Sequence, residues 1–351
     1  MNPRRTAVPL DTEPITTCPA CGSCTARVAH ANVADHCFSV PGTWQINTCC
    51  TCGSLYLATR VPFENVMEIY KNYPEHHRAK QAGKGGKRNP IVALFPASVR
   101  RALKLGILNS RLGYLSSGAA TLPFLVGKAL GSLSRVKFDR IEASVMFLPY
   151  RPGGAVLDVG CGAGGLLADL RNHGWTVRGI DFDPEAVAIA RNFDIHVTCG
   201  TLSEHNFPPE AFDAITMKHV IEHEYQPDEL LKECYRALKP GGRLSIITPN
   251  AASYGHMKFG PFWRGLEPPR HTQIYSMAGI SHALSKAGFD KVAAWTNARN
   301  ARFMWGASRN ACKKNTRGVI AGIRGLLFAL RERTMRDASE ELCAIAQKPT
   351  A

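Results

Sequence analysis

The sequence predicts an α/β protein with a doubly wound sheet, preceded by a small cysteine-rich module. Three observations predict this architecture. Strand-like and helix-like segments alternate from Val156 onward, a glycine-rich turn follows the first strand, and seven of the twelve cysteines lie within the first 52 residues. Strands that alternate with helices at short spacing are typical of a parallel sheet covered on both faces.

The first strand begins at Val156 and leads into a glycine-rich turn. Residues Leu166 to Leu170 then form the first turns of a helix, so the turn presents backbone N–H groups at a helix N-terminus. Its glycines let a ligand approach the main chain closely. Gly160, Gly162 and Gly165 also satisfy the loose pattern of dinucleotide-binding folds, so this turn alone leaves the ligand open.

The second predicted strand, residues 176–181, ends at Asp181, where dinucleotide-binding folds place a ribose-binding carboxylate. Phe182 to Glu185 starts the next helix, with a proline and acidic residues in its first turn. The remaining elements are strands at 195–199 and 212–217, a helix at 227–238, and a turn leading into a fifth strand within 238–250.

Five motifs in order resemble the signatures of class I S-adenosylmethionine-dependent methyltransferases, especially the branch of ubiquinone-pathway and sugar O-methyltransferases. They are Asp158-x-Gly160-x-Gly162-x-Gly164, Gly179-Ile-Asp181, Phe212-Asp213, Ile221-Glu-His223 and Leu238-Lys-Pro-Gly-Gly242. The resemblance covers roughly residues 135–295. It implies a Rossmann-like sheet of seven strands that finishes in an antiparallel edge strand at 341–348. A nicotinamide dehydrogenase is not expected to carry the Leu-Lys-Pro-Gly-Gly turn.

The resemblance also implies which residues bind S-adenosylmethionine. The glycines would let the loop pass under the methionine part of the cofactor, and Asp158 would anchor the loop and face the ammonium group. Asp181 would accept both ribose hydroxyls, because a carboxylate suits two parallel donors. Phe182 and Leu202 would enclose the adenine, although Leu202 fits ordinary core nearly as well. The full set is Asp158, Gly160, Gly162, Gly164, Asp181, Phe182, Thr201, Leu202 and Lys218.

Near the N-terminus, Cys18, Cys21, Cys49 and Cys52 form two Cys-x-x-Cys-Gly knuckles. Two such knuckles closing on one tetrahedral ion are typical of a zinc ribbon. Four thiolates leave no open position on the ion, so the predicted zinc is structural. Cys50 could substitute for a neighbouring ligand. A redox pair is the alternative for either knuckle alone, but it explains the duplication poorly.

The formal net charge of +15 is concentrated in two segments. Residues 69–105 carry +8 and residues 298–336 carry +9, so the rest of the chain is close to neutral. Both segments also contain apolar residues, and a basic amphipathic helix can lie on an anionic membrane. Packing of the apolar face on the domain itself is the alternative, and it is favoured for either segment taken singly. RNA binding through phosphates also fits, but aromatic residues for stacking are few.

The sequence divides into three predicted regions. Residues 1–60 form the zinc-ribbon module, 61–140 a helical connection, and 141–351 the methyltransferase domain with a basic amphipathic insertion at 298–336. No secretory signal is visible, and the uncharged run from Leu112 to Gly127 is too short and interrupted to span a membrane. These features predict a cytoplasmic protein, and the two basic segments leave peripheral contact with the inner face of the membrane open. Its cysteines are then expected to be thiols or metal ligands.

The loops after the fourth and fifth strands are expected to hold the acceptor and a general base. His271 is the first choice, because Arg270-His271 before an aromatic-Ser helix start resembles the family's loop after strand five. A histidine that only pins this loop fits about equally well. His219 is the second choice, because it lies nearer the cofactor's reactive end. His223 is expected to orient a helix start.

The predicted function is S-adenosylmethionine-dependent O-methylation of a sugar in a surface polysaccharide or glycolipid, or of a lipid-like intermediate. The acceptor is then a small molecule, a saccharide or a lipid-linked compound. One alternative is an RNA methyltransferase that binds RNA with its ribbon and basic segments. A second alternative is a scaffold that binds the cofactor without turnover.

Overall fold

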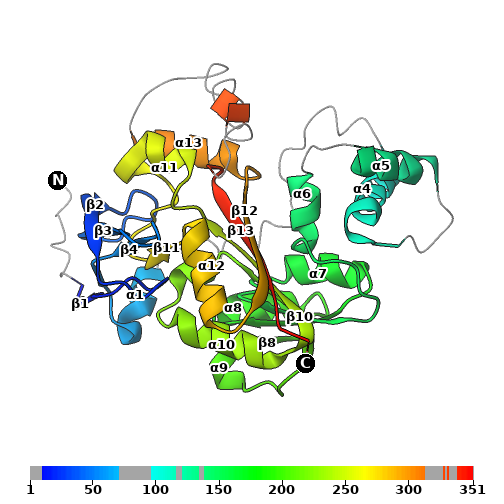
Figure 1. Ribbon diagram of the computed structural model, residues 1–351, viewed down its shortest axis with the longest axis horizontal. Helices are drawn as coiled ribbons and strands as arrows, with labels where there is room; N and C mark the ends of the chain where they lie inside the picture. The colour runs from blue at the N-terminus through cyan, green and yellow to red at the C-terminus, as the bar shows by residue number, and fades with distance from the viewer. Residues whose placement is uncertain are drawn as a thin grey trace. The chain divides into compact units, whose positions relative to one another are not determined.

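The computed structural model describes residues 10–70, 96–115, 121–133, 138–312, 327–328, 330–331 and 338–350. The chain divides into two compact units. Figure 1 labels their helices and strands. The described residues of the first unit lie within Met1–Tyr73, His219–Tyr235 and Ile246–Ala346. Those of the second unit lie within Pro74–Lys218, Arg236–Ser245 and Gln347–Ala351.

The second unit contains four parallel strands, the helices between them and the helices that precede the first of them. The strands are β6 (Ala155–Val159), β7 (Thr176–Asp181), β8 (Val197–Cys199) and β9 (Phe212–Lys218). The helices are α4 (Ala97–Leu112), α5 (Leu122–Leu133), α6 (Asp139–Glu142), η2 (Ala143–Val145), α7 (Gly165–Asn172), α8 (Pro184–Arg191) and α9 (Leu202–His205). In β6 four of the five residues are buried, as expected for a parallel strand covered on both faces.

Local sequence explains why α8 begins where it does and how it packs with α7. The Asp183 side chain caps α8 by accepting a hydrogen bond from the Glu185 N–H at 2.9 Å, and Pro184 occupies the first helical position. The two helices then bury their apolar sides in one cluster, formed by Cys161, Leu167, Val187, Ala190, Ile195 and Val197. This packing holds the turn after β6 close to the end of β7.

The first unit contains the N-terminal strands and most of the elements after β9. Its N-terminal elements are β1 (Glu13–Pro14), β2 (Ala26–Ala34), β3 (Thr43–Cys49), β4 (Leu55–Leu57), β5 (Thr59–Arg60), η1 (Phe63–Asn65) and α1 (Val66–Tyr70). Its later elements are η3 (Ile221–His223), α11 (Tyr254–Phe259), η4 (Gly260–Phe262), β11 (Gln273–Ile274), α12 (Met277–Lys286), β12 (Asp290–Asn297), α13 (Ala301–Ala311) and β13 (Glu341–Gln347). Helix α10 (Pro227–Ala237) and strand β10 (Leu238–Pro249) each have residues in both units.

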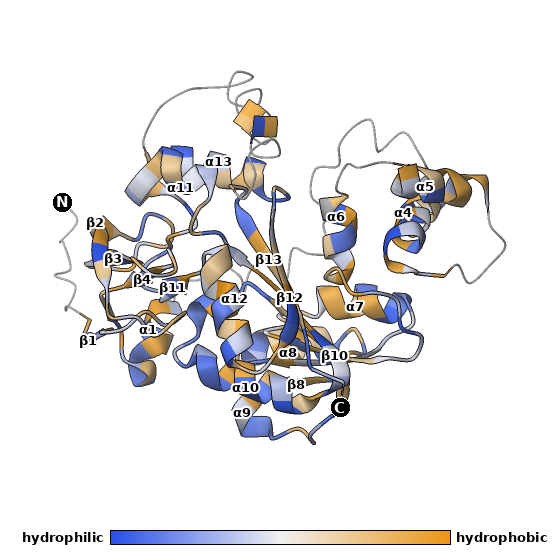
Figure 2. Cartoon of the chain, viewed as in Figure 1, coloured by the Kyte–Doolittle hydropathy of each residue, from blue (hydrophilic) through white to orange (hydrophobic). Residues whose placement is uncertain are grey.

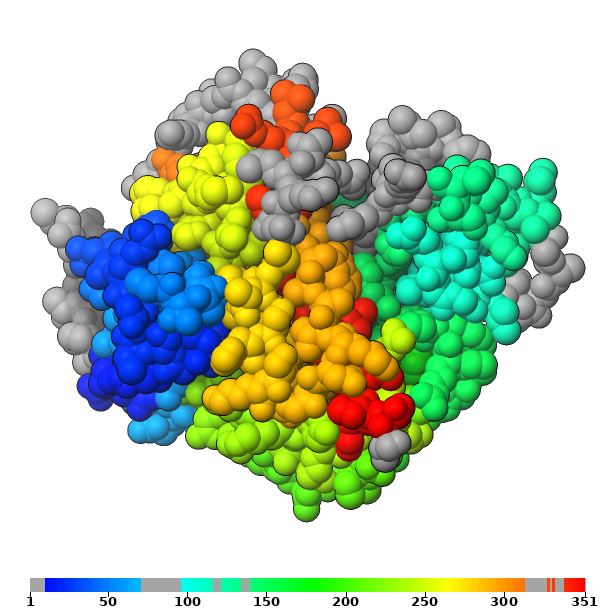
Figure 3. Space-filling view, in the orientation of Figure 1, coloured from blue at the N-terminus to red at the C-terminus, as the bar shows by residue number. Residues whose placement is uncertain are grey.

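A four-stranded sheet in the order β11-β4-β3-β2 combines distant parts of the chain, and we call it the ribbon sheet. Strand β11 pairs antiparallel with β4, with Gln273 opposite Tyr56 and Ile274 opposite Leu55. Trp44, Ile46, Leu55, Trp263 and Ile274 are buried in one cluster beneath it. In Figure 3 the blue N-terminal strands and the yellow-to-orange segment around α12 cover adjacent areas of the surface. The N-terminal module therefore shares its sheet and its core with residues 263–274.

The large sheet has seven strands in the order β12-β13-β10-β9-β6-β7-β8, which confirms the predicted seven-stranded α/β fold. The predicted position of the last strand is wrong. Strand β13 lies between β12 and β10, and β12 forms the edge. The burial patterns explain this order, because the first four residues of β13 are all buried whereas β12 begins with partly and fully exposed residues in alternation.

The predicted turn before the fifth strand is also part of the strand, because β10 already begins at Leu238. The N–H of Gly241 donates to the Lys348 carbonyl, and the N–H of Lys348 donates to the Gly242 carbonyl, which places this segment in the ladder. Of the two basic segments, residues 71–95 and most of 313–337 lie outside the described residues. Within the described part of the chain, no helix has the length and apolar character needed to cross a membrane.

Candidate functional site

The glycine-rich loop after β6 is tied to the end of β7 by backbone hydrogen bonds. The N–H groups of Gly160 and Cys161 both donate to the Ile180 carbonyl, at 2.8 and 3.1 Å. The N–H of Gly162 donates to Asp181 Oδ2 at 2.7 Å, and Asp181 Oδ1 accepts from the N–H of Asp183 at 2.9 Å. The Asp181 carboxylate therefore fixes the shape of both loops at this end of the sheet.

Asp158 is a buried carboxyl at the end of β6. Thr216 Oγ1 donates a hydrogen bond to Asp158 Oδ1 at 2.6 Å. Burial raises the pKa of Asp158 to about 7, although the hydrogen bond from Thr216 and the charge of Lys218 lower it. A cationic group beside Asp158 favours its ionised form, because opposite charges stabilise each other at short range.

The other implied cofactor residues follow the carboxyl ends of neighbouring parallel strands. Phe182 is 51% exposed after β7, whereas Leu202 is buried in α9. The N–H of Thr201, at the start of α9, donates to Glu204 Oε2 at 2.7 Å. Lys218 ends β9 and is exposed. All nine implied residues lie in the second compact unit, where parallel pairing brings the four strand ends to one edge.

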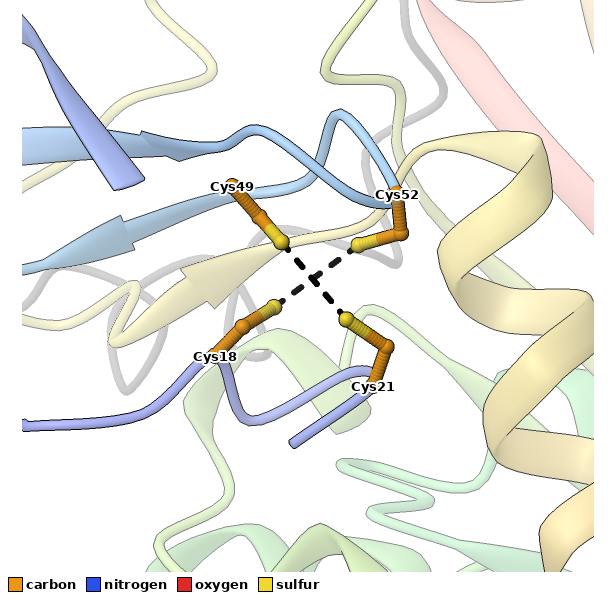
Figure 4. A group of neighbouring side chains, drawn as sticks. All are labelled: Cys18, Cys21, Cys49 and Cys52. Atoms are coloured by element: carbon orange, nitrogen blue, oxygen red, sulfur yellow. Dashed lines mark hydrogen bonds between the residues drawn. The ribbon is translucent and has the colours of Figure 1, made fainter. Parts of the chain in front are cut away.

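The four predicted metal ligands, Cys18, Cys21, Cys49 and Cys52, point their sulfur atoms at one central point (Figure 4). The Sγ atoms of Cys18 and Cys52 are 3.7 Å apart, and those of Cys21 and Cys49 are 3.5 Å apart. A tetrahedral ion with zinc–sulfur bonds of about 2.3 Å requires sulfur separations of about 3.8 Å. The four thiols therefore fit one zinc ion.

The two knuckles have the same internal hydrogen bonds. The N–H of Gly22 donates to the Cys18 carbonyl at 2.7 Å, and the N–H of Gly53 donates to the Cys49 carbonyl at 2.9 Å. Among the remaining N-terminal cysteines, Cys24, Cys37 and Cys50 are exposed. One ligand atom from each of the four predicted cysteines lies within 4.8 Å of the others, and this set does not include Cys50.

The structure places His271 in a buried cluster with Glu222 and His223. Its Nδ1 donates to the Gly265 carbonyl at 2.7 Å, because a carbonyl oxygen can only accept. Burial lowers the pKa of His271 to about 4, so the ring is neutral at neutral pH and its Nε2 carries the lone pair. The His223 ring lies edge-on to it, with 4.7 Å between the ring centroids. His271 thus pins its loop through Nδ1 and keeps Nε2 unprotonated, and its lowered pKa makes Nε2 a weak proton acceptor.

His219 lies between two carboxylates, Glu222 and Glu341. Its Nδ1 is 3.2 Å from Glu222 Oε1, and its Nε2 is 3.1 Å from Glu341 Oε1. Burial alone lowers the pKa of His219, but the two hydrogen bonds outweigh it and raise the pKa to about 9. Arg299 also contacts Glu341, at 2.8 Å. The His219 ring is therefore positively charged at neutral pH, with both nitrogens occupied, which leaves no lone pair for a general base.

The charge on His219 predicts a pH dependence of stability. Because the pKa of His219 is higher in the folded protein than in the unfolded chain, the charged ring stabilises the fold. This contribution is complete at pH values below the unfolded pKa of 6.5, and it is lost as the pH rises through the folded pKa of about 9. We expect the free energy of unfolding, measured by urea denaturation, to fall over this window. In His219→Asn the fall in this window should be smaller, and Asn suits the backbone here because φ is 57°. Equal pH profiles for both proteins would contradict the assignment.

The sequence analysis missed a buried network that surrounds the His271 loop. Arg270 is fully buried, and its guanidinium donates to Glu267 Oε1 at 3.0 Å and to Asp35 Oδ2 at 2.9 Å. It also stacks over the ring of Phe38, 4.3 Å from the centroid. Arg270 therefore ties the loop that carries His271 to the loop between β2 and β3. The Arg270-His271 pair is visible in the sequence, but the contact of Arg270 with Asp35 is not.

Parts of the chain are similar in sequence to known proteins. The sequence model of a family described as a methyltransferase domain matches residues 135–294. A probable S-adenosylmethionine-dependent methyltransferase of Mycolicibacterium smegmatis is 32% identical over 159 residues, which cover 44% of this chain and 59% of that protein. The ubiquinone biosynthesis O-methyltransferase of Xanthomonas oryzae pv. oryzae is 35% identical over 130 residues, which cover 35% of this chain and 53% of that protein.

The chain contains a class I S-adenosylmethionine-dependent methyltransferase domain. It spans little more than half the length of the relatives above. Among solved structures, phosphoethanolamine N-methyltransferase 2 of Haemonchus contortus superimposes with a TM-score of 0.44 and 19% identity, covering 60% of this chain and 52% of that chain.

The loop after β6 of this methyltransferase domain has open space beside its main chain. A Cβ atom added at Gly162 would meet no protein atom within 4 Å, so open space borders the main chain there. The φ angle of Gly162 is 53°, which L side chains rarely adopt. Asp181 reaches this loop from the end of β7, where a ligand that offers hydroxyl donors can meet a carboxylate.

We expect Gly162→Ala to weaken S-adenosylmethionine binding about tenfold or more, because the added methyl group occupies the space beside the loop. The backbone strain should cost about 1 kcal/mol of stability. Gly153→Ala is the matched control, since Gly153 has a φ of 67° and open space around its Cβ position, but lies in the turn before β6. Calorimetric titration should show a binding defect in the first variant only, with similar melting temperatures for both.

Proposed function

We propose that the protein transfers a methyl group from S-adenosylmethionine to an oxygen of its acceptor. The acceptor is a sugar of a surface polysaccharide or glycolipid, or a lipid-like biosynthetic intermediate. The observation that carries the proposal is the loop of Gly162 held by Asp181, within a domain related to O-methyltransferases. The bound cofactor supplies an electrophilic methyl group, and the protein supplies position, exclusion of water and a proton acceptor.

His271 is the proposed proton acceptor. O-methylation of a hydroxyl releases a proton, and a neutral histidine with a free lone pair can take it. The hydrogen bond from Nδ1 to Gly265 fixes the tautomer that leaves Nε2 unprotonated. His219 is proposed to hold Glu222 and Glu341 in place through its charge, and not to act as a base.

We also propose that Cys18, Cys21, Cys49 and Cys52 hold one structural zinc ion. The sulfur separations support this proposal, as does the burial of three of the four cysteines. With four thiolates bound, the ion has no open position for substrate, so its contribution is to the fold.

A labelling experiment tests the acceptor class directly. Purified protein is incubated with methyl-labelled S-adenosylmethionine and a lysate that lacks the gene, and RNA, lipid, saccharide and small-molecule fractions are separated. Label in the lipid or saccharide fraction is expected. Label that RNase releases would replace this proposal with an RNA methyltransferase, and label in none of the fractions would support the cofactor-binding scaffold.

The role of His271 is tested by a pair of histidine variants. We expect His271→Ala to lose at least about 100-fold in the rate of transfer while its affinity for S-adenosylmethionine stays unchanged. His282→Ala is the control, because His282 is exposed on α12 in the same compact unit. Equal activity of the two variants would remove His271 from the mechanism.

A further inference from the structure

Helix α5 presents an apolar face to solvent, which is unusual for a segment of a folded domain. Its outward residues are between 44% and 85% exposed, and they are Leu122, Leu125, Val126, Leu130 and Leu133. Figure 2 shows the apolar colouring of α5 beside hydrophilic stretches of α4. A contiguous exposed patch of aliphatic side chains is a typical sign of an interaction surface.

The opposite face of α5 is already fully packed against α4. A Cβ atom added at Gly127 would lie 2.3 Å from the Leu103 carbonyl oxygen, and one added at Gly106 would lie 2.1 Å from the Phe124 carbonyl oxygen. The two helices thus approach backbone to backbone, with Phe124 buried beside them. Because this contact occupies the inner face, the leucines on the outer face have to meet something other than α4.

The charges around α5 indicate what the outer face meets. No Asp or Glu occurs between Glu75 and Asp139, whereas twelve Lys and Arg residues lie in the same stretch. On the described helices these cations are Arg100, Arg101, Lys104, Arg111 and Lys128. Arg111 pairs with Glu142 at 2.9 Å, and this ion pair links α4 to α6. An aliphatic face on a helix pair whose described residues include five cations and no acidic residue complements an anionic lipid surface.

The dimensions of α5 indicate that it lies on a bilayer and does not cross it. The helix has 12 residues, which corresponds to about 18 Å at about 1.5 Å per residue. The hydrocarbon core of a bilayer is about 30 Å thick. The outward residues follow a helical spacing, so one side of α5 can enter the boundary between headgroups and acyl chains while α4 stays in the polar layer.

We propose that the α4–α5 hairpin docks the protein on the surface of an anionic membrane. The leucines of α5 enter the headgroup boundary, and the exposed Arg101 and Lys128 contact lipid phosphates. This surface is separate from the residues that hold the cofactor, so the inference goes beyond the proposed methyl transfer. It gives the enzyme a route to acceptors that reside in or on a membrane.

Vesicle sedimentation of the full chain tests the proposal. Vesicles of phosphatidylcholine alone are compared with vesicles that also contain phosphatidylglycerol, at low and high salt. We expect binding to the anionic vesicles only, weakened by salt. The double variant Leu125→Glu/Leu130→Glu should bind at least about tenfold more weakly, because burying a leucine contributes more than a tenfold change in affinity. Met257→Glu, which alters a similarly exposed apolar residue outside the hairpin, should bind like the wild type.

Two further measurements keep the outcome unambiguous. S-adenosylmethionine affinity reports whether the double variant is folded, because the cofactor residues lie in the same compact unit as α5. If the double variant no longer binds S-adenosylmethionine, the milder variant Leu125→Gln is used in its place, and its vesicle binding should also be about tenfold weaker. Equal vesicle binding of wild type and folded variant would overturn the proposal. So would a wild type that ignores vesicles but forms a dimer that the variant breaks, since the apolar face would then cover a second copy.

Discussion

Replacing Asp181 with alanine lowers the affinity for S-adenosylmethionine by about 100-fold or more, and this is among the largest effects we expect. The carboxylate accepts the N–H groups of Gly162 and Asp183 at 2.7 and 2.9 Å, so it shapes both loops before any ligand arrives. The family resemblance implies that the same carboxylate accepts both ribose hydroxyls of the cofactor. Hydrogen bonds to a charged group contribute about 1.5 to 3 kcal/mol each, so losing these two lowers the affinity by about this factor. Calorimetric titration of the purified variant measures it.

Two further variants separate the carboxylate's role from a general loss of charge or structure. Asp169→Ala removes an exposed carboxylate from α7 and should leave the affinity unchanged. Asp181→Asn can still accept one of the two amide hydrogen bonds, so it should fall between alanine and the wild type. An alanine variant that binds the cofactor as tightly as the wild type would remove Asp181 from the site.

Replacing Cys18 with serine abolishes zinc binding and destabilises the first compact unit by about 3 kcal/mol or more. Zinc binding by four-ligand sites in small domains contributes about 10 to 16 kcal/mol, so losing one thiolate removes a large part of the folding free energy of the ribbon. The site is also linked to α12. Ser276 Oγ donates to the Cys52 carbonyl, and the N–H of Ser276 donates to Ser54 Oγ at 3.1 Å. Metal content by atomic emission and chemical denaturation give the two readouts.

Hydrogen exchange shows how far the effect of metal loss extends. We expect faster exchange at residues 271–279 in Cys18→Ser. These residues include β11, which pairs with β4 beside the metal site, and they continue into the capped start of α12. The affinity for S-adenosylmethionine should change less than about twofold, since the cofactor residues belong to the other compact unit. Cys24→Ser is the control, because Cys24 is an exposed cysteine of the same module. Retention of one zinc ion by Cys18→Ser would refute the assignment of this ligand.

The features that the sequence reveals are those whose residues are close together in the chain. The glycine loop, Asp181 at the end of a strand, and the two cysteine knuckles each lie within a few residues, so spacing alone reveals them. The alternation of strands and helices likewise predicts the doubly wound sheet, whereas its seven strands are implied by the family resemblance. Spacing does not show which strand lies at the edge, because β13 reaches its position only through pairing with distant strands.

The missed features depend on long-range contacts between short segments. Arg270 meets Asp35 across 235 residues, and His219 meets Glu341 across 122 residues. Strand β11 has only two residues, so it carries no periodic pattern that could mark it as a strand. The exposed face of α5 is hidden for another reason. Its mostly apolar sequence, interrupted by Lys128, is too short for a membrane span, and only the packing against α4 shows which of its apolar residues face outward.

The pairing of β4 with β11 determines the order in which this protein can be completed during synthesis. Leu55 leaves the ribosome 219 residues before Ile274, its partner in the ribbon sheet. Both cysteine knuckles are finished by Cys52, so metal capture can precede the arrival of β11 by most of the translation time. Until then β4 presents an unpaired strand edge, which other nascent chains can extend into aggregates. We expect that without the proposed zinc ion the ribbon strands are less well held while this edge is open, so synthesis in zinc-depleted medium should raise the aggregated fraction.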